Sequence, residues 1–204
     1  MSKGAKWFSM EEKERLRKEL CSECEKYWRT KGYKKTGISE LTKEVGISTG
    51  AFYSLFASKE KLFLQTIQGI QSRVKSQIEI YIKENPNKTG ACNSLKYLFK
   101  EYMENPFLYD FSSPDFWALI EKLPKDQWKS IQQSNINFLA DIVKKANLRF
   151  EVEPGKARAV LVTLLYTVTL KEENSYSRQE IFDFLLDCSF DKLFSQNQEG
   201  SHNE

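Results

Sequence analysis

Hydrophobic residues recur at helical spacing along most of the chain, and no segment alternates convincingly between apolar and polar positions as a half-buried strand would. Proline and glycine divide this pattern, because proline cannot continue a helix and glycine readily ends one. We therefore predict an all-α protein. Its helices are expected over about 9–30, two short segments on either side of Gly46, 59–84, 91–104, 114–123, 125–146, 156–170 and 178–194.

The stretch 36–63 is the most informative part of the chain, because two short amphipathic patterns meet within it. Gly46 lies at the junction and is suited to the left-handed backbone that ends a helix sharply. Ser48 is placed to cap the second helix. The apolar positions of each helix fall on one face: Ile38, Leu41 and Val45 in the first, and Phe52 and Phe56 in the second.

The outward face of the second short helix is small and polar and has one hydroxylated aromatic residue. Two short helices joined by a tight turn, with such a face, predict a helix-turn-helix that approaches DNA closely. Thr49, Ser54 and Ala51, the last through a thymine methyl group, are candidates for base contacts. The predicted DNA-binding residues are Thr36, Gly37, Ser39, Ser48, Thr49, Gly50, Ala51, Tyr53, Ser54 and Lys59.

Within that set, Tyr53 and Thr36 are expected to donate to phosphates, and Lys59 to add charge at the start of the long helix. The charge distribution agrees with a DNA-binding head. Residues 1–60 hold 13 Lys and Arg against 9 Asp and Glu, a net +4, although the whole chain of 204 residues carries only +3. On charge alone, a solvated helix face is an equally good interpretation.

This segment resembles the DNA-binding head of the TetR family of bacterial transcriptional regulators. The resemblance rests on Thr36, Ile38, Leu41, Gly46, Ile47, Ser48, Gly50, Phe52, Tyr53, Phe56, Ser58, Lys59, Glu60 and Leu62, with Tyr27, Trp28, Gly32 and Tyr33 upstream. It implies a repressor that a small hydrophobic molecule releases from a palindromic, double-stranded DNA operator. Three positions depart from the family pattern. Gly37 stands where Ser or Thr is usual, Thr42 where Ala is usual, and Thr49 where Lys or Arg is common.

The chain is expected to divide into a helix-turn-helix domain over 9–62, with the motif at about 37–56, and a ligand-binding and dimerisation domain over 63–194. A disordered tail is expected over 195–204. The last two helices are apolar around most of their circumference, so each must be covered on several sides. We predict a two-fold homodimer joined by a four-helix interface, with contacts from Leu161, Leu165, Val168, Phe182, Leu185 and Leu186.

Aromatic residues concentrate around the break after Asn105. They either line a cavity for a hydrophobic effector or fill a core, and their spacing does not distinguish the two. The candidate pocket residues are Phe99, Tyr102, Phe107, Phe111, Phe116, Trp117, Trp128 and Tyr166.

Other classes of function find little support in the residues. The one histidine, His202, lies in a polar tail, and there is no Ser-His, metal-binding or Gly-rich phosphate motif, so neither an enzyme nor a cofactor is expected. Cys21 and Cys24 form a C-x-x-C inside a helical pattern, where a structural role is favoured over a redox or metal role. With no secretory signal and no membrane-spanning run, a cytoplasmic protein is expected. An all-α protein that binds a hydrophobic ligand and does not act on DNA remains the alternative.

Overall fold

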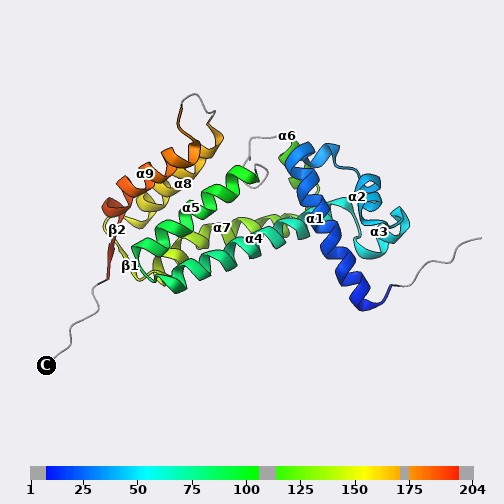
Figure 1. Ribbon diagram of the computed structural model, residues 1–204, viewed down its shortest axis with the longest axis horizontal. Coiled ribbons are helices and arrows are strands. Elements are labelled where there is room, and N and C mark those ends of the chain that lie inside the picture. Colours follow the sequence, from blue (N-terminus) through cyan, green and yellow to red (C-terminus); the bar gives the residue numbers. More distant parts are fainter. Residues whose placement is uncertain (1–7, 106–113, 171–174, 198–204) are drawn as a thin grey trace, which may run out of the picture. The chain divides into compact units, whose positions relative to one another are not determined.

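The computed structural model describes residues 8–105, 114–170 and 175–197, apart from the side chains of residue 128 and residues 130–137. The predicted all-α fold class is confirmed (Figure 1). Contacts divide the chain into two units, one of Met1–Ser72 with Pro106–Pro124 and the other of Arg73–Asn105 with Lys125–Glu204. This division differs from the predicted boundary after residue 62, because the segment 106–124 groups with the N-terminal unit.

The N-terminal unit is built from short helices around the first part of a long one. Its elements are α1 (Met10–Lys35), α2 (Ile38–Val45), α3 (Thr49–Leu55), the beginning of α4 (Lys59–Glu84) and α6 (Pro114–Ile120). Trp28 and Tyr33 of α1 pack on Phe63 of α4, with ring centroids 4.4 and 5.0 Å apart. Burial of such large aromatic rings contributes much of the stability of a small domain.

Helix α1 continues to Lys35, five residues beyond the predicted end, but it is interrupted at Gly32, where φ is 77° and ψ 175°. A residue with a Cβ atom adopts this backbone only with strain, so glycine is required. At the other end, Ser9 and Glu12 form a capping box in which each side chain accepts a hydrogen bond from the other residue's backbone N–H.

The C-terminal unit is a helical bundle that holds the remainder of α4. Its other elements are α5 (Lys88–Glu104), α7 (Lys125–Lys145), β1 (Leu148–Phe150), α8 (Pro154–Tyr166), the 3₁₀ turn η2 (Thr167–Thr169), α9 (Arg178–Leu193) and β2 (Phe194–Gln196). Helix α5 packs on α9, where the rings of Phe99 and Phe182 stack with centroids 4.0 Å apart. Lys96 pairs with Asp187 at 2.9 Å across the same contact.

The predicted absence of strands is wrong, and residues 195 and 196 of the tail that was expected to be disordered lie in β2. β1 and β2 form a short antiparallel pair in which Phe150 stands opposite Phe194, with ring centroids 5.3 Å apart. Asn147, with φ of 53°, ends the preceding helix, as left-handed residues commonly do. Three residues per strand are too few to produce a recognisable alternation, so the pattern of the sequence could not indicate this pair.

Candidate nucleic-acid interface

The turn between α2 and α3 has the predicted local structure. Gly46 adopts φ of 74°, and its N–H donates back to the Lys43 carbonyl at 3.2 Å. The Ser48 hydroxyl accepts a hydrogen bond from the Ala51 N–H at 3.1 Å, which caps α3. Phe52 and Phe56 are buried, and their rings stack 5.8 Å apart. These contacts fix the angle between the two helices and therefore the direction in which α3 faces.

The outward face of α3 presents small groups to solvent. Thr49, Gly50 and Ser54 are exposed, and Ala51 is half-buried. Tyr53 is 56% exposed, and the edge of its ring contacts Phe52 at 5.3 Å between centroids. Gly50 has no side chain, so nothing prevents the α3 backbone from approaching the floor of a groove at that point.

Thr36 does not face solvent, contrary to its predicted contact with phosphate. Its side chain is fully buried, and its hydroxyl donates to the Gly32 carbonyl at 2.7 Å. This bond stabilises the turn between α1 and α2. The role of Thr36 is therefore to shape the helix-turn-helix.

Lys59 is also turned inward. Its ammonium group donates to the Tyr33 carbonyl at 2.5 Å and lies 4.3 Å from the centre of the Tyr33 ring. Burial lowers the pKa of Lys59, and the nearby Glu60 carboxylate opposes that shift. The structure therefore directs this side chain toward Tyr33, whereas a contact with phosphate was predicted.

The exposed lysines of the motif lie elsewhere. Lys34 and Lys35 are exposed at the end of α1, and Lys43 is exposed near the end of α2. Ser39, a predicted contact, is exposed one turn before Lys43 and on the same face of α2. The first helix of a helix-turn-helix crosses the DNA backbone, so these positions suit phosphate contacts. Their spacing along α2 was the signal that sequence reasoning missed.

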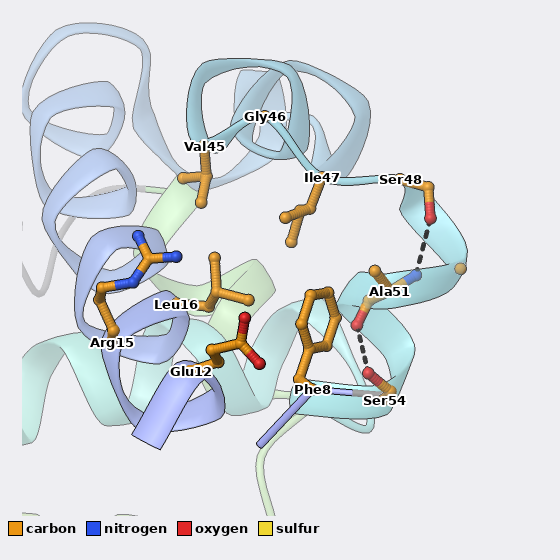
Figure 2. A pocket seen from close by; sticks show the side chains of 11 residues that line it. Phe8, Glu12, Arg15, Leu16, Val45, Gly46, Ile47, Ser48, Ala51 and Ser54 are labelled. Carbon is orange, nitrogen blue, oxygen red and sulfur yellow. Dashed lines mark hydrogen bonds between the residues drawn. The ribbon is translucent and has the colours of Figure 1, made fainter. Parts of the chain in front are cut away.

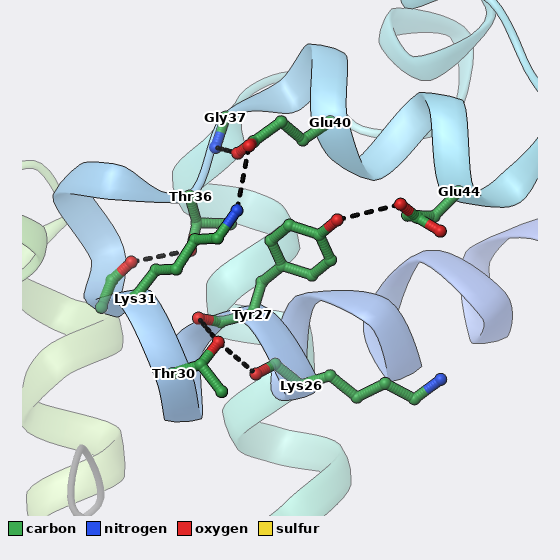
Figure 3. Close-up of polar contacts among 9 residues, drawn as sticks. Lys26, Tyr27, Thr30, Lys31, Thr36, Gly37, Glu40 and Glu44 are labelled. Carbon is green, nitrogen blue, oxygen red and sulfur yellow. Dashed lines mark hydrogen bonds and ion pairs between the residues drawn. The ribbon is translucent and has the colours of Figure 1, made fainter.

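The acidic side chains of α2 are held by α1 (Figure 3). The Tyr27 hydroxyl donates to Glu44 at 3.0 Å, and the Lys31 ammonium donates to Glu40 at 3.0 Å. Glu40 also accepts from the Gly37 N–H at 3.3 Å, and the hydrogen bonds from Lys31 and Gly37 lower the pKa of its carboxyl. This network directs the two carboxylates toward α1 and away from the face of α2 that carries Lys43.

Helix α6 secures the same junction from another part of the chain. The Asp115 carboxylate accepts a hydrogen bond from the Lys34 N–H at 2.8 Å and another from the Tyr33 N–H. A Cβ atom on Gly32 would lie 2.6 Å from Asp115 Oδ2, so glycine is needed for this approach as well as for the backbone angle. The Tyr33 hydroxyl donates to Glu60 at the start of α4. The peptide groups between α1 and α2 are thus fixed by residues of α4 and α6.

A groove of about 530 Å³ lies between the beginning of α1 and the α2–α3 turn (Figure 2). Its apolar side chains come from Phe8, Leu16, Val45 and Ile47, and it is also lined by the small residues Ser48, Gly50, Ala51 and Ser54. Glu12 accepts a hydrogen bond from the Ser9 N–H at 2.8 Å and Arg15 pairs with Glu19 at 2.6 Å, so both charges at the rim have partners.

Comparison with known proteins agrees with this geometry. Residues 25–66 match the family described as bacterial regulatory proteins, tetR family, a span that covers α2, α3 and the helix ends that hold them. Residues 25–66 therefore carry a DNA-binding domain of the TetR type. The predicted resemblance is therefore confirmed, and the matched residues include every contact that shapes the α2–α3 turn.

Two curated relatives match parts of this chain. The uncharacterized HTH-type transcriptional regulator YuxN of Bacillus subtilis is 29% identical over 133 residues, which cover 65% of this chain and 45% of YuxN. The nucleoid occlusion factor SlmA of Mannheimia succiniciproducens is 35% identical over 79 residues, which cover 38% of this chain and 37% of SlmA. The chain thus spans less than half the length of both relatives.

A likeness in fold extends over nearly the whole chain. A TetR family transcription regulator from Marinobacter aquaeolei VT8 superposes with a TM-score of 0.60, covering 92% of this chain and 100% of its own, at 14% sequence identity. At that identity the likeness concerns the fold alone. The likeness in fold includes the helices of the C-terminal unit.

The structure requires a correction to the predicted dimer interface. Of the predicted residues, all but Leu185 are buried within the subunit: Leu161, Leu165, Val168, Phe182 and Leu186. They pack inside the C-terminal unit, where Phe182 stacks on Phe99. They belong to the core, and only half-buried Leu185 reaches the surface.

Each of the two helices has a second apolar strip on its opposite face. On α9 the strip consists of Ile181, Phe184, Leu185 and Cys188, at spacings of three and four residues. Phe184 is 68% exposed. On α8 it consists of Ala159, Val162, Thr163 and Tyr166, with Leu170 beyond the helix end. We call these residues the outer strip. It agrees with the prediction that both helices are apolar around most of their circumference, although other residues form the outer face.

The predicted pocket residues divide between the two units. Phe116 and Trp117 belong to the N-terminal unit, whereas Phe99, Tyr102 and Tyr166 belong to the C-terminal unit. Phe99 is fully buried against Phe182, which favours core packing for this residue. Burial, with a smaller effect of Tyr166, raises the pKa of Tyr102 to about 12. Phe107, Phe111 and the side chain of Trp128 lie outside the described residues.

The cysteines of α1 have the properties of packing residues. Cys24 is fully buried, and burial raises the pKa of its thiol to about 12. Burial also raises the pKa of the half-buried Cys21. A thiol that stays protonated is a poor nucleophile and a poor metal ligand. Among the described residues there is no cluster of three or more His, Cys, Asp or Glu that could hold a metal ion. None of the described helices is long and apolar enough to cross a membrane.

Proposed function

We propose that this protein is a dimeric, sequence-specific DNA-binding regulator of transcription that acts as a ligand-released repressor. The observation that carries the proposal is the outward face of α3. Its groups are small and exposed, Tyr53 projects from it, and buried residues fix its direction. A helix with this profile fits the major groove, which admits an α-helix.

The outer strip of α8 and α9 supports the dimer. A single recognition helix reads few base pairs, so two heads are needed to select one operator from a genome. Exposed apolar strips on two adjacent helices favour association with a second copy, as in a four-helix interface. The operator would then be approximately palindromic, because the two-fold axis of the protein relates its half-sites.

We further propose that a small hydrophobic effector binds in the C-terminal unit and lowers the affinity for DNA. The match of residues 25–66 to the TetR family, whose resemblance implies release by a small hydrophobic molecule, supports this part of the proposal. An effector can act only if its affinity differs between the DNA-binding state and the released state. Helix α4 contributes residues to both units, so a displacement of its second half is a physical route to the first.

The decisive experiment measures binding of the full chain to the DNA upstream of its own gene, against a random duplex of the same length, by fluorescence anisotropy. A regulator should prefer one palindromic segment by at least about 10³-fold. The logarithm of its association constant should fall linearly with the logarithm of salt concentration. The slope should be about −5 to −9 if six to ten phosphates are neutralised.

Tyr53→Phe tests the α3 surface, because it removes only a hydroxyl group from an exposed ring. We expect it to weaken operator binding by about 1 kcal/mol or more. Tyr176→Phe is the matched control, since Tyr176 is 66% exposed and lies in the other unit. Equal affinity for the operator and the random duplex would refute the proposed role as a sequence-specific regulator. It would favour an all-α protein that binds a hydrophobic ligand without acting on DNA.

A further inference from the structure

No side chain of α3 is of a type that can form two hydrogen bonds to the edge of one base. The helix reads TGAFYSL, and it therefore contains no Arg, Lys, Asn, Gln, Asp or Glu. Guanine is usually read by Arg or Lys, and adenine by Asn or Gln, through such paired hydrogen bonds. Neither kind of contact can come from this helix.

The hydroxyl groups on α3 are limited as well. The Ser54 hydroxyl donates its proton to the Ala51 carbonyl at 2.7 Å, so toward a base it can act only as an acceptor. The Ser48 oxygen accepts from the Ala51 N–H. Tyr53 places its hydroxyl at the end of a long ring, where it suits the phosphate backbone better than a base edge.

What remains on this face is methyl groups held close to a bare backbone. Thr49 is exposed and carries one methyl group, and Ala51 carries another. Between them along the chain lies Gly50, where only hydrogen atoms separate the backbone from a partner. The C5 methyl of thymine is the one apolar group on the major-groove edge of the four bases, and Ala and Thr methyl groups are its usual partners.

We propose that α3 recognises its operator through the methyl groups of thymine, so that the base pairs facing Thr49 and Ala51 are T·A. Ser54, as an acceptor, is compatible with the N6 amino group of the paired adenine. The inference rests on the proposed DNA-binding function and adds the identity of the bases.

The test replaces thymine by deoxyuridine in the operator, one position at a time in both half-sites. This change removes the methyl group and preserves base pairing. Removal of one buried methyl contact lowers affinity by about fourfold, and by about 15-fold when it is lost in both half-sites. We expect this loss at one to three positions per half-site, and no loss at thymines outside the segment that α3 covers.

A pair of variants at Thr49 identifies the protein methyl. Thr49→Val keeps a methyl group and removes the hydroxyl, whereas Thr49→Ser keeps the hydroxyl and removes the methyl. Operator binding by the Thr49→Val variant should still weaken when thymine is replaced by deoxyuridine. Thr49→Ser should bind thymine and deoxyuridine operators equally at the position that Thr49 contacts. The reverse result would assign the contact to the hydroxyl group and overturn the inference.

Two outcomes separate this inference from the proposed function. If the operator is bound at least about 10³-fold more tightly than random DNA, yet deoxyuridine has no effect at any position, methyl recognition is refuted and the regulator stands. If the protein prefers no duplex over random DNA, both methyl recognition and the proposed regulatory function are refuted. Selection from a randomised duplex library gives an independent check. Required guanines at the positions facing Thr49 and Ala51 would also refute the inference.

Discussion

The contact of Asp115 with the peptide groups of Tyr33 and Lys34 makes a specific prediction about the helix-turn-helix. Asp115→Asn keeps the size of the side chain and replaces one carboxylate oxygen by an NH₂ group. One backbone N–H then keeps an acceptor, while the other faces a donor. Because Asp115 lies about 80 residues from its partners in the sequence, the substitution removes a tertiary contact and leaves the local helix intact.

The expected magnitude follows from the geometry. Each hydrogen bond to an ionised acceptor contributes about 1.5–3 kcal/mol, and a buried N–H without a partner costs about 1–3 kcal/mol. The Tyr33 N–H is part-buried and the Lys34 N–H is exposed. We therefore expect the free energy needed to open this junction to fall by about 2 kcal/mol. Such a loss corresponds to about a 30-fold increase in the population of the open form.

Amide hydrogen exchange measures this opening directly. In Asp115→Asn, the Tyr33 and Lys34 amides should exchange about 30-fold faster, while amides of α5 and α9 in the other unit keep their rates. Asp141→Asn is the matched control, because it makes the same chemical change on the exposed face of α7. Unchanged exchange at both amides in a folded Asp115→Asn protein would refute the role of Asp115. The same acceleration in the control would refute it as well.

Three further predictions concern charge and association. Lys43→Ala should reduce the magnitude of the salt slope of operator binding by about 0.9, whereas Lys59→Ala should leave the slope unchanged. Equal effects of the two substitutions would contradict the inference that, of these two lysines, only Lys43 contacts phosphate. Phe184→Asp should yield monomers at micromolar concentration in sedimentation equilibrium, with Ile80→Asp, another exposed apolar residue, remaining dimeric. The lowered pKa of Glu40 stabilises the fold above its unfolded value of 4.5, and this contribution is lost as the pH falls. The difference in unfolding free energy between wild type and Glu40→Gln should therefore be largest above pH 4.5 and shrink as the pH falls through the lowered pKa of Glu40. A constant difference from pH 3 to 7 would contradict it.

Local signals in the sequence were sufficient for the turn between α2 and α3. Gly46, Ser48, Phe52 and Phe56 act on residues within one helical turn, so their types and spacing determine their roles. The departure at Thr42 from the usual alanine is explained in the same local way. Its buried hydroxyl donates to the Ser39 carbonyl at 3.1 Å, which satisfies the polar atom within α2.

Contacts between distant residues were the reason for the errors at Thr36 and Lys59. Both sit where an exposed polar side chain was expected, but the bend at Gly32 provides a buried carbonyl for Thr36 and the ring of Tyr33 provides a face for Lys59. Neither the bend nor the Asp115 contact that secures it can be read from neighbouring residues. The direction of a long side chain is decided by such partners and not by its position in a motif.

The outer strip of α8 and α9 illustrates a different difficulty. The composition of α8 and α9 indicated correctly that they are apolar on more than one face, but it could not say which face packs within the subunit. That choice depends on α5, which supplies Phe99 as the partner of Phe182. Once this inner face is assigned, the outer strip follows from helical spacing, and Phe184 is a large apolar member of it that is 68% exposed.

The two proposals together predict how much specificity a monomer would keep. Two or three methyl contacts of about 0.8 kcal/mol each discriminate by only about 15- to 60-fold for one head. Two heads acting together multiply these ratios to about 200- to 3,600-fold, which reaches the lower range of specific DNA binding. The monomeric Phe184→Asp variant should therefore prefer the operator over random DNA by only about the square root of the wild-type ratio. A monomer that retained the full ratio would show that one α3 helix reads the site alone, and the argument from methyl contacts would then fail.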